Sequence, residues 1–331
     1  MMILKTNFLG NLRPEVRAAA AKDLVQLQRI RYAKAAHRAE QNARWLISLC
    51  GVLVALVPIF IGLFLAVKGS GTFLTFGHSF FEFLLSGQWA PNDGEGGGGQ
   101  VGAAMFLAGS LVTCLEALVI ALPFSLTTAI CMTEMVAPGT RRLIQPAVEL
   151  FTGIPSVVYG WVGLMVLIPF LRKFFPMPYG FSVLAAGCVL AVMIFPTITT
   201  MAADAIAAVP QSWRDASYGL GATRWETIAR VVLPAAKSGI FSGIILGLAR
   251  AMGEALAVAM VIGQMKVFPT SLLKPASTLT TIIASDMGGA MEGGEYSAAL
   301  WSMGLLLFLI SFVFIYLIHQ LGRQVPKGAR T

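Results

Sequence analysis

The sequence predicts an all-α integral membrane protein with six transmembrane helices. Hydrophobic residues make up 56% of the 331 residues and charged residues only 12%, whereas a soluble domain carries about 25% charge. The mean hydropathy is +0.76. Long apolar stretches, each near the about 20 residues that a spanning helix needs, recur along the chain, whereas a membrane barrel would alternate over segments of about 10 residues. We therefore expect spans at 45–67, 103–131, 143–170, 182–208, 233–263 and 297–320.

The basic residues predict how these spans are oriented. Residues 1–44 hold nine Lys and Arg against three acids, and 18 of the 24 basic residues fall on the same side of the membrane as this tail. Because cytoplasmic segments are enriched in Lys and Arg, we expect basic cytoplasmic tails at 1–44 and 323–331, so that both termini lie inside. The net charge of +8 then serves topology and does not indicate nucleic-acid binding. The tail 1–44 either lies on the anionic inner leaflet or is solvated.

The outer connections and the prolines predict where the bundle departs from regular helix. The first outer loop, 68–100, contains "NDGEGGGG", and its four successive glycines favour a flexible tether or a mobile lip. The second long outer connection is 263–296. Pro123, Pro155 and Pro196 lie within predicted spans, where such interruptions face protein or a water-filled path, or serve packing alone.

The cysteines and histidines predict no metal site. The four cysteines and three histidines are far apart in the sequence and lack metal-ligand spacing. We therefore expect the cysteines to be packing residues.

The segment 210–234 is unusually polar for its position between two apolar spans. Ser212 and Asp215, then Thr223 and Glu226, have the spacing of two capping boxes, which predicts two short helices. Gly219 or Gly221 can end the first helix, and Pro234 kinks or restarts the second where the fifth span begins. We expect Asp215, Ala216 and Ser217 to form a small-residue surface that fits a groove of another protein.

The spacing within this segment resembles the EAA loop of the permease subunits of ABC importers of type I. The family pattern E-A-A-x3-G-x9-I-x-L-P is matched here by these residues: Asp215, Ala216, Ser217, Gly221, Val231, Leu233 and Pro234. Asp replaces Glu, Ser replaces the second Ala, and Val replaces Ile. The resemblance implies a coupling loop at 210–234 that docks on an ATPase subunit. The chain contains no G-x-x-x-x-G-K-[ST] motif, so we expect a non-catalytic permease subunit without a cofactor, with ATP and Mg on partner ATPase subunits.

Three further stretches resemble PstC-type permeases of phosphate-specific importers: "GIPSVVYG", "GLGATRWETIARVVLPAAKSGI" and "GLARAMGEALAVAMVIG". The resemblance covers most of residues 100–320, with the permease core expected at 101–322, and departs at Ala255, where the family commonly has Thr. It implies inorganic phosphate as substrate and a bacterial inner-membrane complex. The implied partners are a second homologous permease, two ATPase subunits and a periplasmic phosphate-binding protein that docks on the outer loops.

Two charged residues lie deep within the fifth predicted span, away from Lys237 near its start. Arg250 and Glu254 are four residues apart, so a continuous helix places both on one face. The arginine fork suits phosphate oxygens, which favours an anion pathway in which Glu254 holds Arg250 until the anion displaces it. A static structural pair is the alternative. Glu116 and Glu149 also lie at membrane depth and stay unassigned.

Other transporter classes also place charges inside the membrane. A permease for another oxyanion, such as sulfate, molybdate or phosphonate, fits the same class. An ion-coupled secondary carrier or a passive channel would also account for Arg250 and Glu254. The loop at 210–234 distinguishes these classes, because a carrier or a channel has no use for an ATPase-docking helix.

Overall fold

The computed structural model describes residues 14–94, 98–177 and 179–323. Within these residues, six helical segments are long and apolar enough to cross a membrane, which confirms the predicted number. Their bounds are Ala43–Leu74, Ala104–Met135, Ser156–Phe174, Val183–Ala207, Arg224–Gly253 and Glu295–Gln320. The first 13 residues of the basic N-terminal tail, and residues 324–331 of the C-terminal tail, lie outside the described residues.

The chain forms two compact units, residues 1–63 and 64–331. The described part of the first unit is a single helix, α1 (Pro14–Gly69), which has 56 residues, contains Pro58 and continues into the second unit. The basic tail therefore continues into the first apolar span as one helix, without a break near residue 44. All remaining elements belong to the second unit.

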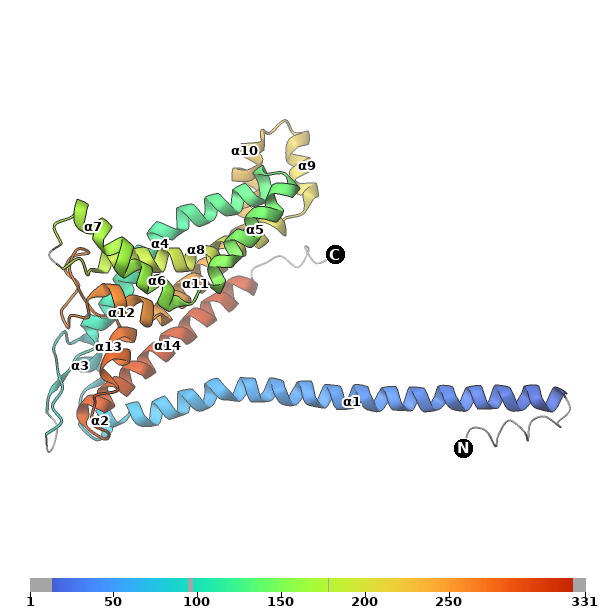
Figure 1. Cartoon of the computed structure of the whole chain (residues 1–331), viewed down its shortest axis with the longest axis horizontal. Helices are drawn as coiled ribbons and strands as arrows, with labels where there is room; N and C mark the ends of the chain where they lie inside the picture. The colour runs from blue at the N-terminus through green and yellow to red at the C-terminus, as the bar shows by residue number, and fades with distance from the viewer. Residues whose placement is uncertain (1–13, 95–97, 178, 324–331) are drawn as a thin grey trace. The chain divides into compact units, whose positions relative to one another are not determined.

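The core of the second unit is built around α8 (Val183–Ala207), which packs between α4 (Ala104–Ile130) and α11 (Leu233–Gly253) (Figure 1). In α8, 67% of the most apolar 18-residue stretch is buried inside the protein, more than in any other span of the described chain. Leu190, Ile194 and Ile198 are each buried to 1% exposure or less. The helix is therefore enclosed by protein over most of its surface, although Val192 (47% exposed) and Asp204 remain exposed.

Three glycines at every fourth position bring α11 close to α8. A Cβ added at Gly239, Gly243 or Gly247 would lie 2.5 to 2.8 Å from a side-chain carbon of α8. The α8 side chains at these contacts are Ala205, Met201 and Ile198. Small residues at this spacing let two membrane helices approach closely, so the α8–α11 contact depends on the absence of these side chains.

Two of the predicted spans are interrupted in the structure. The segment predicted as one span at 143–170 is divided at Ile154 and Pro155, which are extended. It contains α5 (Pro138–Gly153), then α6 (Ser156–Val162), a π-helical turn (Gly163–Leu167) and α7 (Ile168–Phe174). The span predicted at 233–263 divides at Glu254, between α11 and α12 (Leu256–Ile262). By contrast, α4 and α8 continue through Pro123 and Pro196.

The first outer loop is more ordered than its glycines predict. It contains α2 (Gly71–Leu74), α3 (Phe80–Leu85) and the antiparallel strands β1 (Trp89–Ala90) and β2 (Gln100–Val101). The buried carboxylate of Glu295 accepts hydrogen bonds from the backbone N–H groups of Asn92 (2.6 Å), Gly98 (2.9 Å) and Gly99 (3.0 Å). These hydrogen bonds hold the described residues Asn92, Gly98 and Gly99 on Glu295, whereas the glycines predict a flexible tether or mobile lip; residues 95–97 lie outside the described residues.

The second outer connection lies at the same end of the bundle. Its residues include α13 (Leu279–Asp286), which begins at a capping box of Thr278 and Thr281. Partial burial acts to raise the pKa of Asp286, but hydrogen bonds from Lys266, Ser285 and Tyr296 outweigh it and hold that pKa below its ordinary value. At the opposite end of the unit lie α9 (Gln211–Gly219) and α10 (Arg224–Thr227) (Figure 1). The long connections therefore alternate between the two ends, as the predicted topology requires.

Replacing Glu295 by Gln should destabilise the protein, because the amide offers one acceptor oxygen where the carboxylate offers two. We expect a loss of about 2 kcal/mol, the order for a buried group left with unmade hydrogen bonds, measured as a lower thermal midpoint in detergent. Glu292→Gln is the matched control, since the Glu292 side chain is 94% exposed, and it should change stability by less than about 0.5 kcal/mol. Equal midpoints for the two variants would show that Glu295 does not hold the loop.

Candidate functional site

The polar segment between the fourth and fifth spans forms a compact projection of α9 and α10. The first of its two predicted helix starts is wrong: α9 begins at Gln211 after Pro210, and no side chain caps its start. The carboxylate of Asp215 instead accepts a hydrogen bond from Gln211 Nε2 at 3.0 Å. Proline before the first turn already fixes the chain for helix entry, so the predicted cap at Ser212 is not needed.

The second predicted helix start is confirmed. Thr223 and Glu226 form a capping box in which each side chain bonds the backbone of the other residue. Gly221, with φ +84°, makes the turn between the two helices, a conformation that favours glycine. From Arg224 the helix continues through a π-helical turn (Ile228–Val232) into α11, and Pro234 lies in the first turn of α11.

The exposed surface of this projection differs from the predicted small-residue surface. Asp215 and Ala216 are exposed, but Ser217 is buried and its Oγ lies 2.9 Å from Thr227 Oγ1 of α10. Val231 and Leu233 are half-buried, and Pro234 is exposed.

The projection also exposes large apolar side chains that the sequence analysis does not assign. These are Trp213 (50% exposed), Tyr218 (41%), Leu220 (89%) and Trp225 (63%). Tryptophan and tyrosine are enriched at protein interfaces. The concentration of such residues in an otherwise polar segment is the sequence signal that could have identified them.

Arg214 joins the projection to the spans beneath it. Its Nη2 lies 2.6 Å from Glu134 Oε1, and both side chains are less than 10% exposed. Its Nη1 and Nη2 also donate to the carbonyls of Val209 (2.5 Å) and Ile206 (2.9 Å) at the end of α8. Glu134 lies in the π-helical turn that extends α4 (Cys131–Met135). No local pattern could have paired these two residues, because 80 positions separate them.

The structure separates Arg250 from Glu254. Arg250 is in the last turn of α11, and its Nη1 donates to Thr197 Oγ1 of α8 at 2.9 Å. Glu254 follows the helix in an extended conformation, and its Oε1 accepts from the backbone N–H of Ala257 at 3.0 Å. The i, i+4 pairing expected from the sequence is therefore wrong, because the helix ends between the two residues.

Neighbouring groups form hydrogen bonds with the carbonyl and the carboxylate of Glu254, where the helix breaks. Thr280 Oγ1 donates to the Glu254 carbonyl at 2.7 Å, so the freed backbone has a partner at membrane depth. Glu254 also lines a small cavity of about 10 Å³ together with Ser110, Thr113 and Thr278. A cavity of this size holds about one water molecule.

The two unassigned acids differ in their surroundings. Both carboxylate oxygens of Glu116 are buried without a hydrogen-bond partner among the described residues, and the side chain packs against Gly187 of α8. Glu149 of α5 accepts a hydrogen bond from Gln145 Nε2 at 2.9 Å.

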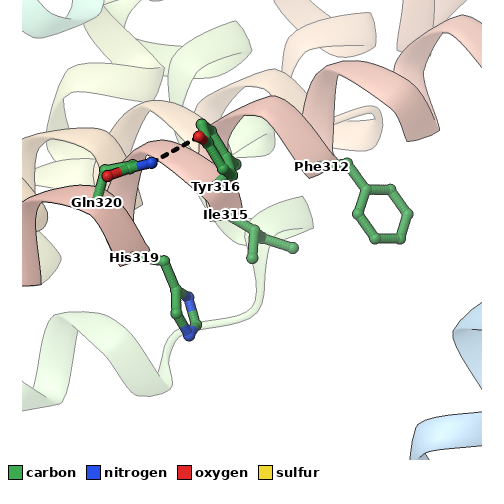
Figure 2. A pocket seen from close by; sticks show the side chains of 5 residues that line it. All are labelled: Phe312, Ile315, Tyr316, His319 and Gln320. Atoms are coloured by element: carbon green, nitrogen blue, oxygen red, sulfur yellow. Dashed lines mark hydrogen bonds between the residues drawn. The ribbon is translucent and has the colours of Figure 1, made fainter. Parts of the chain in front are cut away.

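The described residues offer no metal site, and a hollow on α14 (Glu295–Arg323) offers no further binding site. No group of three or more His, Cys, Asp or Glu residues among the described residues could hold a metal ion. The hollow of about 280 Å³ lies on one face of α14, and the side chains that line it are drawn in Figure 2. Its lining residues all belong to that helix: Phe312, Ile315, Tyr316, His319 and Gln320. It gathers one histidine and mainly apolar side chains, so it carries no chemistry of its own.

Comparison with known proteins places these features in a family. The family model of the binding-protein-dependent transport system inner membrane component matches residues 122–326. The "Probable ABC transporter permease protein YqgH" of Bacillus subtilis is 45% identical over 285 residues, 86% of this chain and 91% of that protein. The "Phosphate transport system permease protein PstC" of Mesorhizobium japonicum is 38% identical over 300 residues, 85% of this chain and 88% of that protein.

A solved structure of a bacterial ABC transporter, described as involved in the import of the acidic polysaccharide alginate, shares the fold. Its TM-score is 0.56 at 15% identity, over 85% of this chain and 96% of that chain. At this identity the likeness concerns the fold alone. The six spans, the family match over more than half of the chain and the two relatives lead to one conclusion: the chain is a multi-pass membrane protein that belongs to the family of binding-protein-dependent transport system inner membrane components.

Proposed function

We propose that this chain is the permease subunit of an ATP-driven importer that moves inorganic phosphate across the bacterial inner membrane. The observation that carries the proposal is the exposed α9–α10 projection at one end of the spans, in a chain 38% identical to a phosphate transport system permease protein over 85% of its length. The substrate test below would reveal transport of another oxyanion, but no observation favours that alternative.

The α9–α10 projection is the proposed docking site for an ATPase subunit. Its exposed Trp213, Leu220 and Trp225 offer apolar area to a cleft on the partner, and Asp215 adds a charge at the same surface. ATP and Mg would bind on two such ATPase subunits. A second homologous permease and a periplasmic phosphate-binding protein complete the proposed complex, the latter at the end of the bundle that carries Glu295.

Arg250 is the proposed phosphate contact inside the membrane. A guanidinium has five N–H donors, and one of its nitrogens donates to Thr197, which leaves donors for phosphate oxygens. Glu254 lies beyond the helix end, and its neighbouring cavity of about 10 Å³ is too small for phosphate. In this conformation the chain is therefore closed beside Glu254, and transport requires that region to open.

Transport should depend on the partners. We expect the purified chain alone in liposomes to import no phosphate, and the complete complex with its binding protein to import phosphate only when ATP is supplied. Competition with sulfate, molybdate and phosphonate measures the substrate preference. Phosphate uptake by the chain alone would refute the proposal. If another oxyanion competes more strongly than phosphate itself, that oxyanion is the substrate.

The turn at Gly221 should matter more than the neighbouring Gly219. An added Cβ meets no atom within 4 Å at either glycine, but only Gly221 of these two has a positive φ. Gly221→Ala should cost roughly 1 kcal/mol of local strain and should reduce both co-purification of the ATPase subunit and phosphate uptake. Gly219→Ala, the matched control, should leave both near normal. If the two variants behave alike, the geometry of this turn is not needed for docking.

Arg250→Lys tests the pathway. The lysine keeps the charge but loses the planar fork, so uptake should fall about tenfold, which corresponds to one charge-assisted hydrogen bond of about 1.5 kcal/mol. Thr197→Val removes the hydrogen-bond partner of Arg250 and keeps the guanidinium, so uptake should stay within about twofold. Uptake and thermal midpoint are measured on both assembled complexes. Equal losses of uptake would assign Arg250 a structural role.

A further inference from the structure

The buried ion pair of Arg214 and Glu134 is the connection between the docking projection and the membrane-spanning helices. Arg214 comes from the inner side of α9 and is 8% exposed. Besides the 2.6 Å contact of its Nη2 with Glu134, its Nε donates to the same carboxylate at 3.2 Å. Arg224 of α10 adds a hydrogen bond to the Glu134 carbonyl. Both short helices of the projection therefore bond the end of α4.

The same arginine holds the end of α8. The carbonyls that accept from Arg214 are those of Ile206, in the last turn of α8, and of Val209, two residues beyond the end of that helix. Within the projection, Ser217 and Thr227 join α9 to α10 through their hydroxyls. These contacts make the projection, the end of α4 and the end of α8 one hydrogen-bonded body.

We propose that Arg214 and Glu134 are positioning residues that transmit movement of the docking projection to α4 and α8. The proposal rests on the proposed function, because it requires an ATPase subunit that moves the projection. The outer side of α9 presents Trp213 to a partner, Leu220 is exposed directly after the helix, and the inner side of α9 presents Arg214 to the bundle. A displacement of α9 by the partner would therefore reach two membrane-spanning helices through directed hydrogen bonds.

The choice of residues supports a geometric role more than a contribution to stability. Burying two charges costs desolvation energy, and apolar side chains of similar volume often replace such a pair without loss of stability. The planar guanidinium can bond a carboxylate and two carbonyls in fixed directions, which a lysine ammonium cannot reproduce. The pair therefore fixes the position of α9 relative to α4 and α8.

The test compares assembled complexes that contain the partner permease, the ATPase subunits and the binding protein. The double variant Arg214→Met with Glu134→Met removes both buried charges, so it should fold and retain the ATPase subunits. We expect the phosphate imported per ATP hydrolysed to fall at least tenfold, and hydrolysis to stop responding to the binding protein. Arg142→Met is the control, because Arg142 is an exposed arginine of α5, outside the 210–234 loop, and this variant should match the unchanged complex.

A normal ratio of import to hydrolysis in the double variant would overturn the proposal. Loss of the ATPase subunits from the purified complex would also overturn it, since the pair would then shape the docking surface. If the double variant does not assemble, Arg214→Lys keeps the charge pair, and a normal ratio in that variant would overturn the proposal equally. If the unchanged complex imports no phosphate, the substrate proposal fails, but the response of hydrolysis to the binding protein still tests the pair.

Discussion

The close contact between α8 and α11 is the constraint on which the rest of the structure depends. Lipid tails are as apolar as leucine, so membrane helices gain their association from close packing and from polar contacts. Gly239, Gly243 and Gly247 supply that packing, because any side chain on them would collide with α8. Since α11 follows the docking projection and carries Arg250 in its last turn, its packing on α8 places both functional regions relative to the same helix.

The two ends of this helix pair use polar groups in different ways. Near the projection, Arg214 bonds the carbonyl of Ile206 in the last turn of α8 and that of Val209 just beyond it, so α9 is tied to the end of the fourth span. At the other end, Arg250 bonds Thr197 within α8, and the chain then leaves the helix at Glu254. Packing fixes the middle of the pair, and directed hydrogen bonds fix its ends.

Whether a feature could be predicted from the sequence depends on how far apart in the sequence the interacting residues lie. Long apolar stretches and the capping box at Thr223 are local patterns, and the structure contains both. The third span was misplaced because the apolar pattern continues across Ile154 and Pro155, where the backbone is extended. The pairing of Arg250 with Glu254 assumed an uninterrupted helix. The contact between Arg214 and Glu134 spans 80 positions, so it depends on how α4 and α8 pack, which no local pattern contains.

The buried acids at the two ends of the bundle show why the membrane-spanning helices and the loops differ in what holds them. Glu134 is satisfied mainly by another side chain, Arg214, and so joins secondary-structure elements to one another. Glu295 is satisfied by backbone N–H groups and by His78 at 2.7 Å, and so fixes the path of a loop. A glycine-rich loop suits that second arrangement, because side chains at Gly99 would occupy the space of the carboxylate. Gly98 and Gly99, two of the glycines that predict flexibility in the sequence, therefore donate to Glu295, and this buried carboxylate is one of the groups that order the outer end.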